Sequence, residues 1–129
     1  MHGANIQDAG KPASAGGERA QSGDAREAPA HISYWRWGGT YLTRYFHWEA
    51  GEAYDGRTPA LLLSHGFAAS AEQWERLVHQ LRVQTVAANG GADALPPIYA
   101  IDLLGFGFSE KPGMTYTQYV WEAQIVDFA

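Results

Sequence analysis

The chain has 129 residues, a formal net charge of −5 and no cysteine. Its length fits one domain or part of a larger one, and an apolar fraction of 46% excludes a wholly disordered chain. The acidic balance argues against nucleic-acid binding, which needs a basic surface. The lack of cysteine excludes disulfides, thiolate metal sites and a cysteine nucleophile. No apolar run reaches the roughly 18 residues that span a bilayer.

Residues 1–33 are predicted to form a disordered, acidic, Ala/Gly-rich arm, and residues 34–129 the folded part. The arm has almost no large apolar side chain, so it cannot bury enough surface to offset its chain entropy. Acidic residues outnumber basic ones in it, unlike in a transit peptide, and it lacks the apolar core of a secretory signal.

The folded part begins with an expected β-hairpin. Residues 34–37 and 41–48 are aromatic and β-prone, and they flank Gly38 and Gly39, which suit a tight turn with positive φ. A short apolar run at 60–64 then predicts a strand that is buried on both faces.

Two helices and one more strand are expected after this run. Ser70 and Gln73 have capping-box spacing before an apolar helical face at 74–81. A long loop at 84–97 leads to a second buried strand at 98–101. Thr115 and Gln118 form a second expected capping box, followed by apolar positions at Trp121, Ile125 and Phe128. Strands that alternate with helices predict an α/β fold with a parallel sheet.

Two segments could carry chemistry, and each has a purely structural alternative. The turn at 64–70 follows a strand and precedes a helix, so its backbone N–H groups could hold a developing oxyanion. The residues alone favour the alternative, a simple strand-to-helix turn in which His65 satisfies a local hydrogen bond. His65 is a poor general base, since no neighbour in the sequence orients it.

The second segment, 102–109, places Asp102 at a strand end before a Gly-x-Gly loop. It is a weak nucleotide signature, because Glu110 stands where a third glycine is needed. The alternative is that Asp102 and Ser109 tie the loop through side-chain to backbone hydrogen bonds.

The sequence contains no G-x-S-x-G nucleophile elbow. Gly107–Lys111 comes closest, but a lysine replaces its last glycine, and it does not link a strand directly to a helix. The histidines outside the first motif show no metal-ligand spacing: His2, His31, His47 and His79. We therefore expect neither a metal site nor a cofactor.

The segments L-L-L-S-H-G-F-A-A-S-A-E-Q-W at 61–74 and Y-A-I-D-L-L-G-F-G-F-S-E-K-P at 99–112 resemble the α/β-hydrolase superfamily. The aromatic hairpin W-R-W-G-G-T-Y-L-T-R-Y and the tail Y-T-Q-Y-V-W-E-A-Q-I-V-D-F are similar to its plant, algal and cyanobacterial branch of pheophytinase-like and chlorophyll-dephytylase-like esterases. Epoxide hydrolases and dehalogenases share the first two segments.

The resemblance implies a role for each matching position. The Phe67 backbone N–H would be one half of an oxyanion hole, and substrate would lie against His65, Gly66, Phe67 and Ala68. The loop after strand 98–101 would be shaped, without a catalytic role, by Asp102, Gly105, Gly107 and Ser109. Strand 98–101 would lie between the second hairpin strand and strand 60–64. The nucleophile-bearing strand would follow the last helix, so the chain is expected to be an N-terminal fragment that ends before it.

The implied parent activity is hydrolysis of small apolar carboxylic esters by a Ser-His-acid triad that this chain does not contain. The alternatives are an epoxide hydrolase or dehalogenase with an aspartate nucleophile, and a non-catalytic fragment that binds an apolar ligand or partner. The isolated chain is expected to be inactive and to self-associate. The compartment stays open: the resemblance admits a chloroplast, residues 1–30 lack a transit composition, and the cytoplasm is the alternative.

Overall fold

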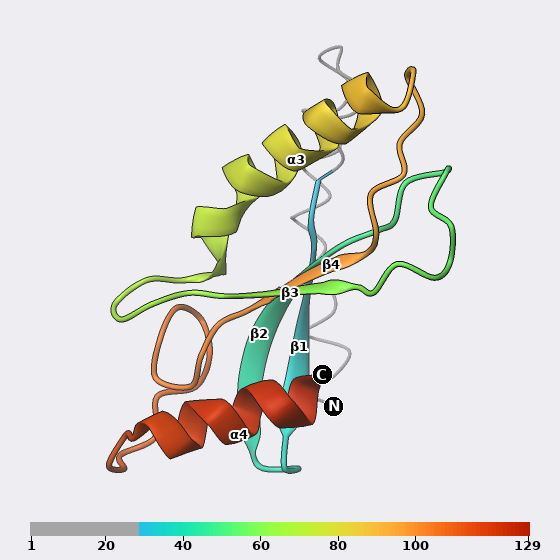
Figure 1. Cartoon of the computed structure of the whole chain (residues 1–129). Helices are drawn as coiled ribbons and strands as arrows, with labels where there is room; N and C mark the ends of the chain where they lie inside the picture. Colours follow the sequence, from blue (N-terminus) through green and yellow to red (C-terminus); the bar gives the residue numbers. More distant parts are fainter. Residues whose placement is uncertain (1–28) are drawn as a thin grey trace.

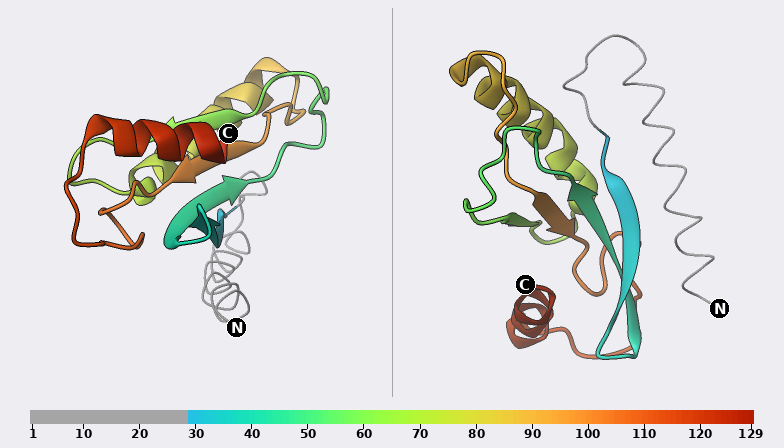
Figure 2. Two further views of the ribbon diagram at one scale, coloured as in Figure 1. Left: turned by 90° about the horizontal axis from the view of Figure 1, so that it is seen from below. Right: turned by 90° about the vertical axis from the view of Figure 1, so that its right-hand side faces the viewer.

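A computed structural model describes residues 29–129, which form a four-stranded mixed sheet with a helix on each face (Figures 1 and 2). The expectation for the arm falls largely on residues 1–28, outside the described residues. The strands are β1 (His31–Trp37), β2 (Tyr41–Trp48), β3 (Leu61–Ser64) and β4 (Ile98–Ile101), in the spatial order β1-β2-β4-β3. Helical segments are the 3-10 turn η2 (Ala71–Trp74) and the helices α3 (Glu75–Ala88) and α4 (Gln118–Phe128).

The hairpin forms as expected around its two glycines. Gly38 and Gly39 have φ values of 59° and 71°, which glycine adopts without steric cost. The first strand begins at His31, however, so residues 31–33 are not part of the arm. They extend the antiparallel ladder, in which His31 lies opposite His47 and Trp37 opposite Tyr41.

Strand β4 is inserted between β2 and β3, as the resemblance implies. It runs antiparallel to β2 and parallel to β3, with Ile98 opposite Trp48 on one side and Leu61 on the other. The sheet is therefore mixed rather than wholly parallel. Because β3 and β4 are parallel, their carboxyl ends meet at one edge of the sheet, where ligand sites of α/β proteins lie.

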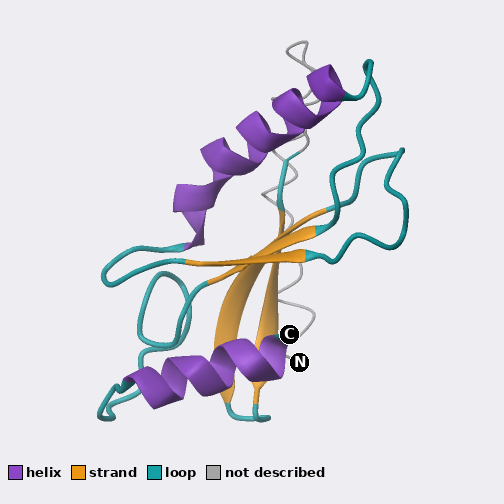
Figure 3. Cartoon of the chain, viewed as in Figure 1, coloured by secondary structure: helices purple, strands orange, loops and turns teal. Residues whose placement is uncertain are grey.

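The helices and strands are distinguished in Figure 3, and an apolar layer holds each of the helices α3 and α4 to the sheet. On the α3 face, alternate strand residues such as Phe46, Trp48 and Ile98 pack with Val78 and Ala71 in one buried cluster. On the α4 face, the Phe128 ring makes edge contacts with Trp35, Tyr45 and Tyr99 at centroid distances of 5.1–5.9 Å. The described residues contain no helix long and apolar enough to cross a membrane.

Neither predicted capping box forms. The N-cap residues are Ser70 and Thr117, and neither side chain makes a capping hydrogen bond. The Ser70 hydroxyl donates instead to the Glu72 carboxylate, so a neighbouring side chain outcompetes the helix end. The predicted 84–97 loop was also too long, because α3 continues to Ala88, where buried Arg82 and Val86 keep it in contact with the rest of the fold.

Candidate functional site

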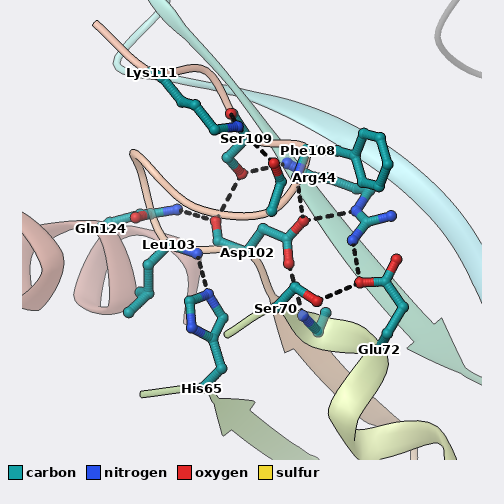
Figure 4. A network of polar contacts seen from close by, with 12 residues as sticks. Arg44, His65, Ser70, Glu72, Asp102, Leu103, Phe108, Ser109, Lys111 and Gln124 are labelled. Carbon is teal, nitrogen blue, oxygen red and sulfur yellow. Dashed lines mark hydrogen bonds and ion pairs between the residues drawn. The ribbon is translucent and has the colours of Figure 1, made fainter. Parts of the chain in front are cut away.

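The two motif loops meet at the carboxyl ends of β3 and β4, where their polar side chains join one hydrogen-bond network (Figure 4). His65 follows β3 directly, and Asp102 follows β4 directly. Both side chains are buried, at 4% and 0% exposure. Each motif directly follows one of two neighbouring parallel strands. Because parallel strands have their carboxyl ends at the same edge of the sheet, the two loops lie side by side.

His65 is held by one hydrogen bond on each ring nitrogen. The Leu103 backbone N–H donates to Nε2 over 2.9 Å, and Nδ1 lies 2.7 Å from the Gly66 carbonyl oxygen. An N–H can only donate and a carbonyl can only accept, so the ring is the neutral tautomer with its proton on Nδ1. Both ring nitrogens are engaged, so neither is free to act as a general base.

The turn after His65 contains the amide that the resemblance assigns to an oxyanion hole. The Phe67 N–H donates to no acceptor among residues 29–129, whereas Ala69 N–H closes a turn onto the Gly66 carbonyl. Ala68 has a φ of 59°, which for a residue with a Cβ costs roughly 1–2 kcal/mol. Such strain persists only where the surroundings fix the backbone.

The space beside this turn is open, and one aromatic side chain extends into it. A Cβ added to Gly66 would meet nothing within 4 Å. The Phe67 side chain is 87% exposed, and its ring makes an edge contact with Phe106 at a centroid distance of 5.4 Å. Phe106 in turn packs against Trp121 at 5.7 Å. Phe67, Phe106 and Trp121 therefore form one aromatic surface beside this turn.

Asp102 is the centre of the network. Its Oδ1 accepts from the Ala71 N–H at 2.7 Å, and its Oδ2 accepts from Arg44 Nε at 2.7 Å and from the Phe108 N–H at 2.9 Å. A buried carboxylate is tolerated only when it is paired and hydrogen-bonded, and here a cation and two amides do this. Asp102 therefore joins β2, the β4 loop and the start of η2.

Arg44 is buried between two carboxylates. Its Nη2 donates to Glu72 at 2.6 Å, in addition to the Nε bond to Asp102. Burial alone would lower the pKa of the guanidinium, but the hydrogen bonds and charges of Glu72 and Asp102 outweigh it, and the pKa is raised. The guanidinium thus stays charged.

The remaining positions of the second motif shape the loop. Gly107 has a φ of 55°, and a Cβ there would collide with the Asp102 carboxylate. Gly105 has a φ of 90°, and a Cβ there would lie 2.8 Å from the Tyr116 ring. The Ser109 hydroxyl donates to the Asp102 carbonyl at 2.7 Å and accepts from the Arg44 N–H at 2.9 Å. Ser109 is buried in these bonds, which is not the setting of a nucleophile.

Three polar residues of the network were not predicted from the sequence. Arg44 and Glu72 form the ion pairs described above, and Gln124 of α4 is fully buried. Gln124 accepts from the Leu104 N–H at 2.8 Å and donates to the Asp102 carbonyl at 3.1 Å. Gln124 thereby attaches α4 to the loop, and its position three residues after Trp121, on the predicted inner face, was the available signal.

No group of three or more His, Asp or Glu residues within 29–129 is arranged to hold a metal ion. A cavity of about 450 Å³ lies elsewhere, between β3 and the end of α4. Its lining is largely aromatic and aliphatic and includes Leu61, Leu62, Tyr99 and Phe128. The residues of the two loops, 64–70 and 102–109, are not part of its lining.

No protein-family model matches the sequence, and no curated protein matches it. Solved structures do match the fold. A thioesterase domain from the curacin biosynthetic pathway is 22% identical with a TM-score of 0.57, over 77% of this chain and 32% of that one. A bacterial membrane phospholipase A is also 22% identical, with a TM-score of 0.58, over 91% and 32% of the two chains.

A haloalkane dehalogenase mutant from Agrobacterium tumefaciens C58 is 18% identical with a TM-score of 0.57, over 84% of this chain and 30% of that one. The chain therefore spans about a third of the length of these structures. Its sheet order and its two loops define the N-terminal portion of the α/β-hydrolase fold. At these identities the likeness establishes the fold and selects no branch within it.

Proposed function

We propose that this chain supplies the oxyanion turn and central strands of an α/β-hydrolase that cleaves carboxylic esters through a Ser-His-acid triad. The observation that carries the proposal is the Phe67 amide, which has no acceptor within residues 29–129 and lies in the turn that follows β3. A preorganised N–H at such a position stabilises the oxyanion of an acyl-transfer intermediate. The nucleophile, acid and catalytic histidine would come from other parts of the protein.

The aromatic surface beside the amide supports an apolar ester as substrate. An acyl or alcohol group bound there would bury the exposed Phe67 ring against Phe106. In the proposed chemistry, substrate contacts come from His65 to Ala68, and the loop residues Asp102, Gly105, Gly107 and Ser109 act only on loop shape. The pheophytinase-like or dephytylase-like branch, and with it a chloroplast, belongs to the same proposal and rests on the sequence resemblance alone.

Two of the structural neighbours are a thioesterase domain and a phospholipase A, which favours ester cleavage. The second candidate is an enzyme with an aspartate nucleophile, and the dehalogenase of equal TM-score supports it. Transcript sequence downstream of codon 129 separates them: G-x-S-x-G selects the esterase, an aspartate in place of its serine selects the alternative, and a stop codon selects the non-catalytic fragment.

The first experiment uses the purified 129-residue chain with a chromogenic short-chain ester and a fluorophosphonate probe. We expect neither turnover nor labelling, because Ser109 is buried and hydrogen-bonded and no described serine is part of a triad. Stoichiometric labelling of a serine in this chain would contradict the proposal.

The second experiment uses the protein with its nucleophile present. Phe67→Pro removes the N–H and should lower kcat by roughly 10²–10³, as loss of one oxyanion donor does. Phe67→Leu keeps the N–H and should change kcat far less. Circular dichroism shows whether both variants fold. Small, equal effects in two folded variants would mean that the turn is structural only.

A further inference from the structure

Arg44 joins three separate segments at the far end of the turn that contains Phe67 (Figure 4). It lies on β2, its Nε bonds Asp102 after β4, and its Nη2 bonds Glu72 in η2. Glu72 Oε1 also accepts from the Ser70 hydroxyl at 2.5 Å. Residues 70 and 72 are thus connected through one carboxylate to a buried cation on another strand.

The guanidinium group contacts two aromatic rings in addition to the two carboxylates that it bonds. Its carbon lies 4.8 Å from the centroid of the Phe46 ring and 4.4 Å from that of Phe108. Arginine presents a planar fork and stackable faces, whereas lysine has one compact charge. A lysine could therefore not reproduce both the forked bonds to the two carboxylates and the contacts with the two rings.

The turn is anchored at both ends, and the Phe67 amide between them has no partner within residues 29–129. At its start His65 accepts the Leu103 N–H, and at its end the Ala71 N–H donates to Asp102, which Arg44 bonds. Between these points the Phe67 N–H has no acceptor within residues 29–129, and Ala68 keeps a positive φ. The two anchored ends, together with the Ala69 N–H bond to the Gly66 carbonyl, therefore fix the strained backbone between them.

We propose that Arg44, acting through Asp102 and Glu72, is a positioning residue that fixes the 66–69 turn so that the Phe67 amide stays aimed at the reacting oxyanion. This inference rests on the proposed function. The proposed role distinguishes Arg44 from an arginine whose buried ion pair only stabilises the fold. The chain contains such a pair, Arg82 with Asp93, which connects α3 to the loop before β4 and contacts no residue of the turn.

Glu72 is the better residue to substitute, because its side chain is partly exposed and its loss leaves no cavity in the core. Glu72→Ala removes the acceptor of Arg44 and Ser70, whereas Glu72→Gln keeps an acceptor oxygen in the same place. Arg44→Lys keeps the positive charge but removes the forked guanidinium that bonds Asp102 and Glu72 together. Arg82→Lys is the matched control, since it changes a buried, paired arginine outside the network.

The first measurement is hydrogen–deuterium exchange on the 129-residue chain. Glu72→Ala and Arg44→Lys should speed exchange at least about tenfold at the Ala71 and Phe108 amides, which both donate to Asp102. Arg82→Lys should do so instead at Leu95, whose N–H donates to Asp93. Exchange at Ala71 that is the same in all four chains, or unprotected in the wild type, would overturn the proposal.

The second measurement is ester turnover by the protein with its nucleophile present. Glu72→Ala should lower kcat by about 10- to 100-fold with KM little changed, because a small misplacement of a catalytic group has this effect. Glu72→Gln should recover most of the loss, and Arg82→Lys should leave kcat unchanged. Equal losses in Glu72→Ala and Arg82→Lys would overturn the positioning role. If the wild type is inactive but shows the expected exchange pattern, the oxyanion function is overturned, and only the anchoring of the turn by Arg44 is supported.

Discussion

The Leu103 backbone N–H donates a hydrogen bond to Nε2 of His65 over 2.9 Å, although the two residues are 38 positions apart in the sequence. The bond joins the ends of two parallel strands and sets the His65 tautomer. It makes the histidine of the first motif and the loop of the second motif parts of one structure.

His65→Ala should destabilise the fold by about 1–3 kcal/mol, the cost of leaving the buried Leu103 N–H without an acceptor. His65→Gln can place a carbonyl oxygen near the position of Nε2, so it should lose much less. Urea unfolding of the three chains measures both effects. Equal losses in the two variants would mean that ring packing, rather than this hydrogen bond, is what matters.

Much of the fold follows from local pattern. The short apolar run at 98–101 forms a strand with the predicted bounds, and Gly38 and Gly39 form the predicted hairpin turn. The capping boxes failed because the pattern considers only the helix end. In the folded chain the Ser70 hydroxyl donates instead to the carboxylate of Glu72, two residues further on, a local partner that the capping-box pattern leaves out.

The polar network was harder to predict, because periodicity marks buried positions without naming their partners. Arg44 alternates along β2 with Phe46 and Trp48, so all three side chains lie on the same, core-facing side of the strand. Its partners, Glu72 and Asp102, are 28 and 58 residues away, so only the strand order brings them together. The oxyanion role of Phe67 comes from the strand–turn–helix order and the sequence resemblance, and it stays a prediction.

Gly107→Ala and Gly56→Ala form a matched pair at two left-handed positions. Gly56 has a φ of 72° with nothing within 4 Å of an added Cβ, so its variant should lose only the roughly 1–2 kcal/mol of backbone strain. Gly107→Ala should lose about 1–3 kcal/mol more, because the new Cβ meets the buried Asp102 carboxylate. Thermal unfolding compares them, and equal shifts in Tm would show that the carboxylate moves away freely.

Stability should fall with acid because of His47. Burial lowers the pKa of its imidazole below 6.5, the charge of His31 lowers it further, and Glu49 opposes both. The unfolded chain therefore binds the proton more readily, so stability is full above about pH 6.5 and is lost as the pH falls toward the folded pKa. Urea midpoints across this window, for wild type and His47→Gln, measure the effect. An unchanged slope in His47→Gln would assign the pH dependence to other groups.

The purified chain should self-associate through the free edge of β3. Within residues 29–129 this strand pairs with β4 alone, and its other edge presents unpaired backbone groups beside the apolar cavity that Leu61 and Leu62 line. The net charge of −5 opposes association, but salt screens it beyond about 8 Å.

Leu61→Lys places a charge on this edge, whereas Leu77→Lys makes the same change on α3, at a side chain of nearly equal exposure, 41% against 39%. Light scattering after size-exclusion chromatography should show a smaller mass for Leu61→Lys, because a charged edge resists pairing. The Leu77→Lys chain should behave like the wild type. A monomeric wild type, or the same mass in both variants, would mean that the edge of β3 does not drive association.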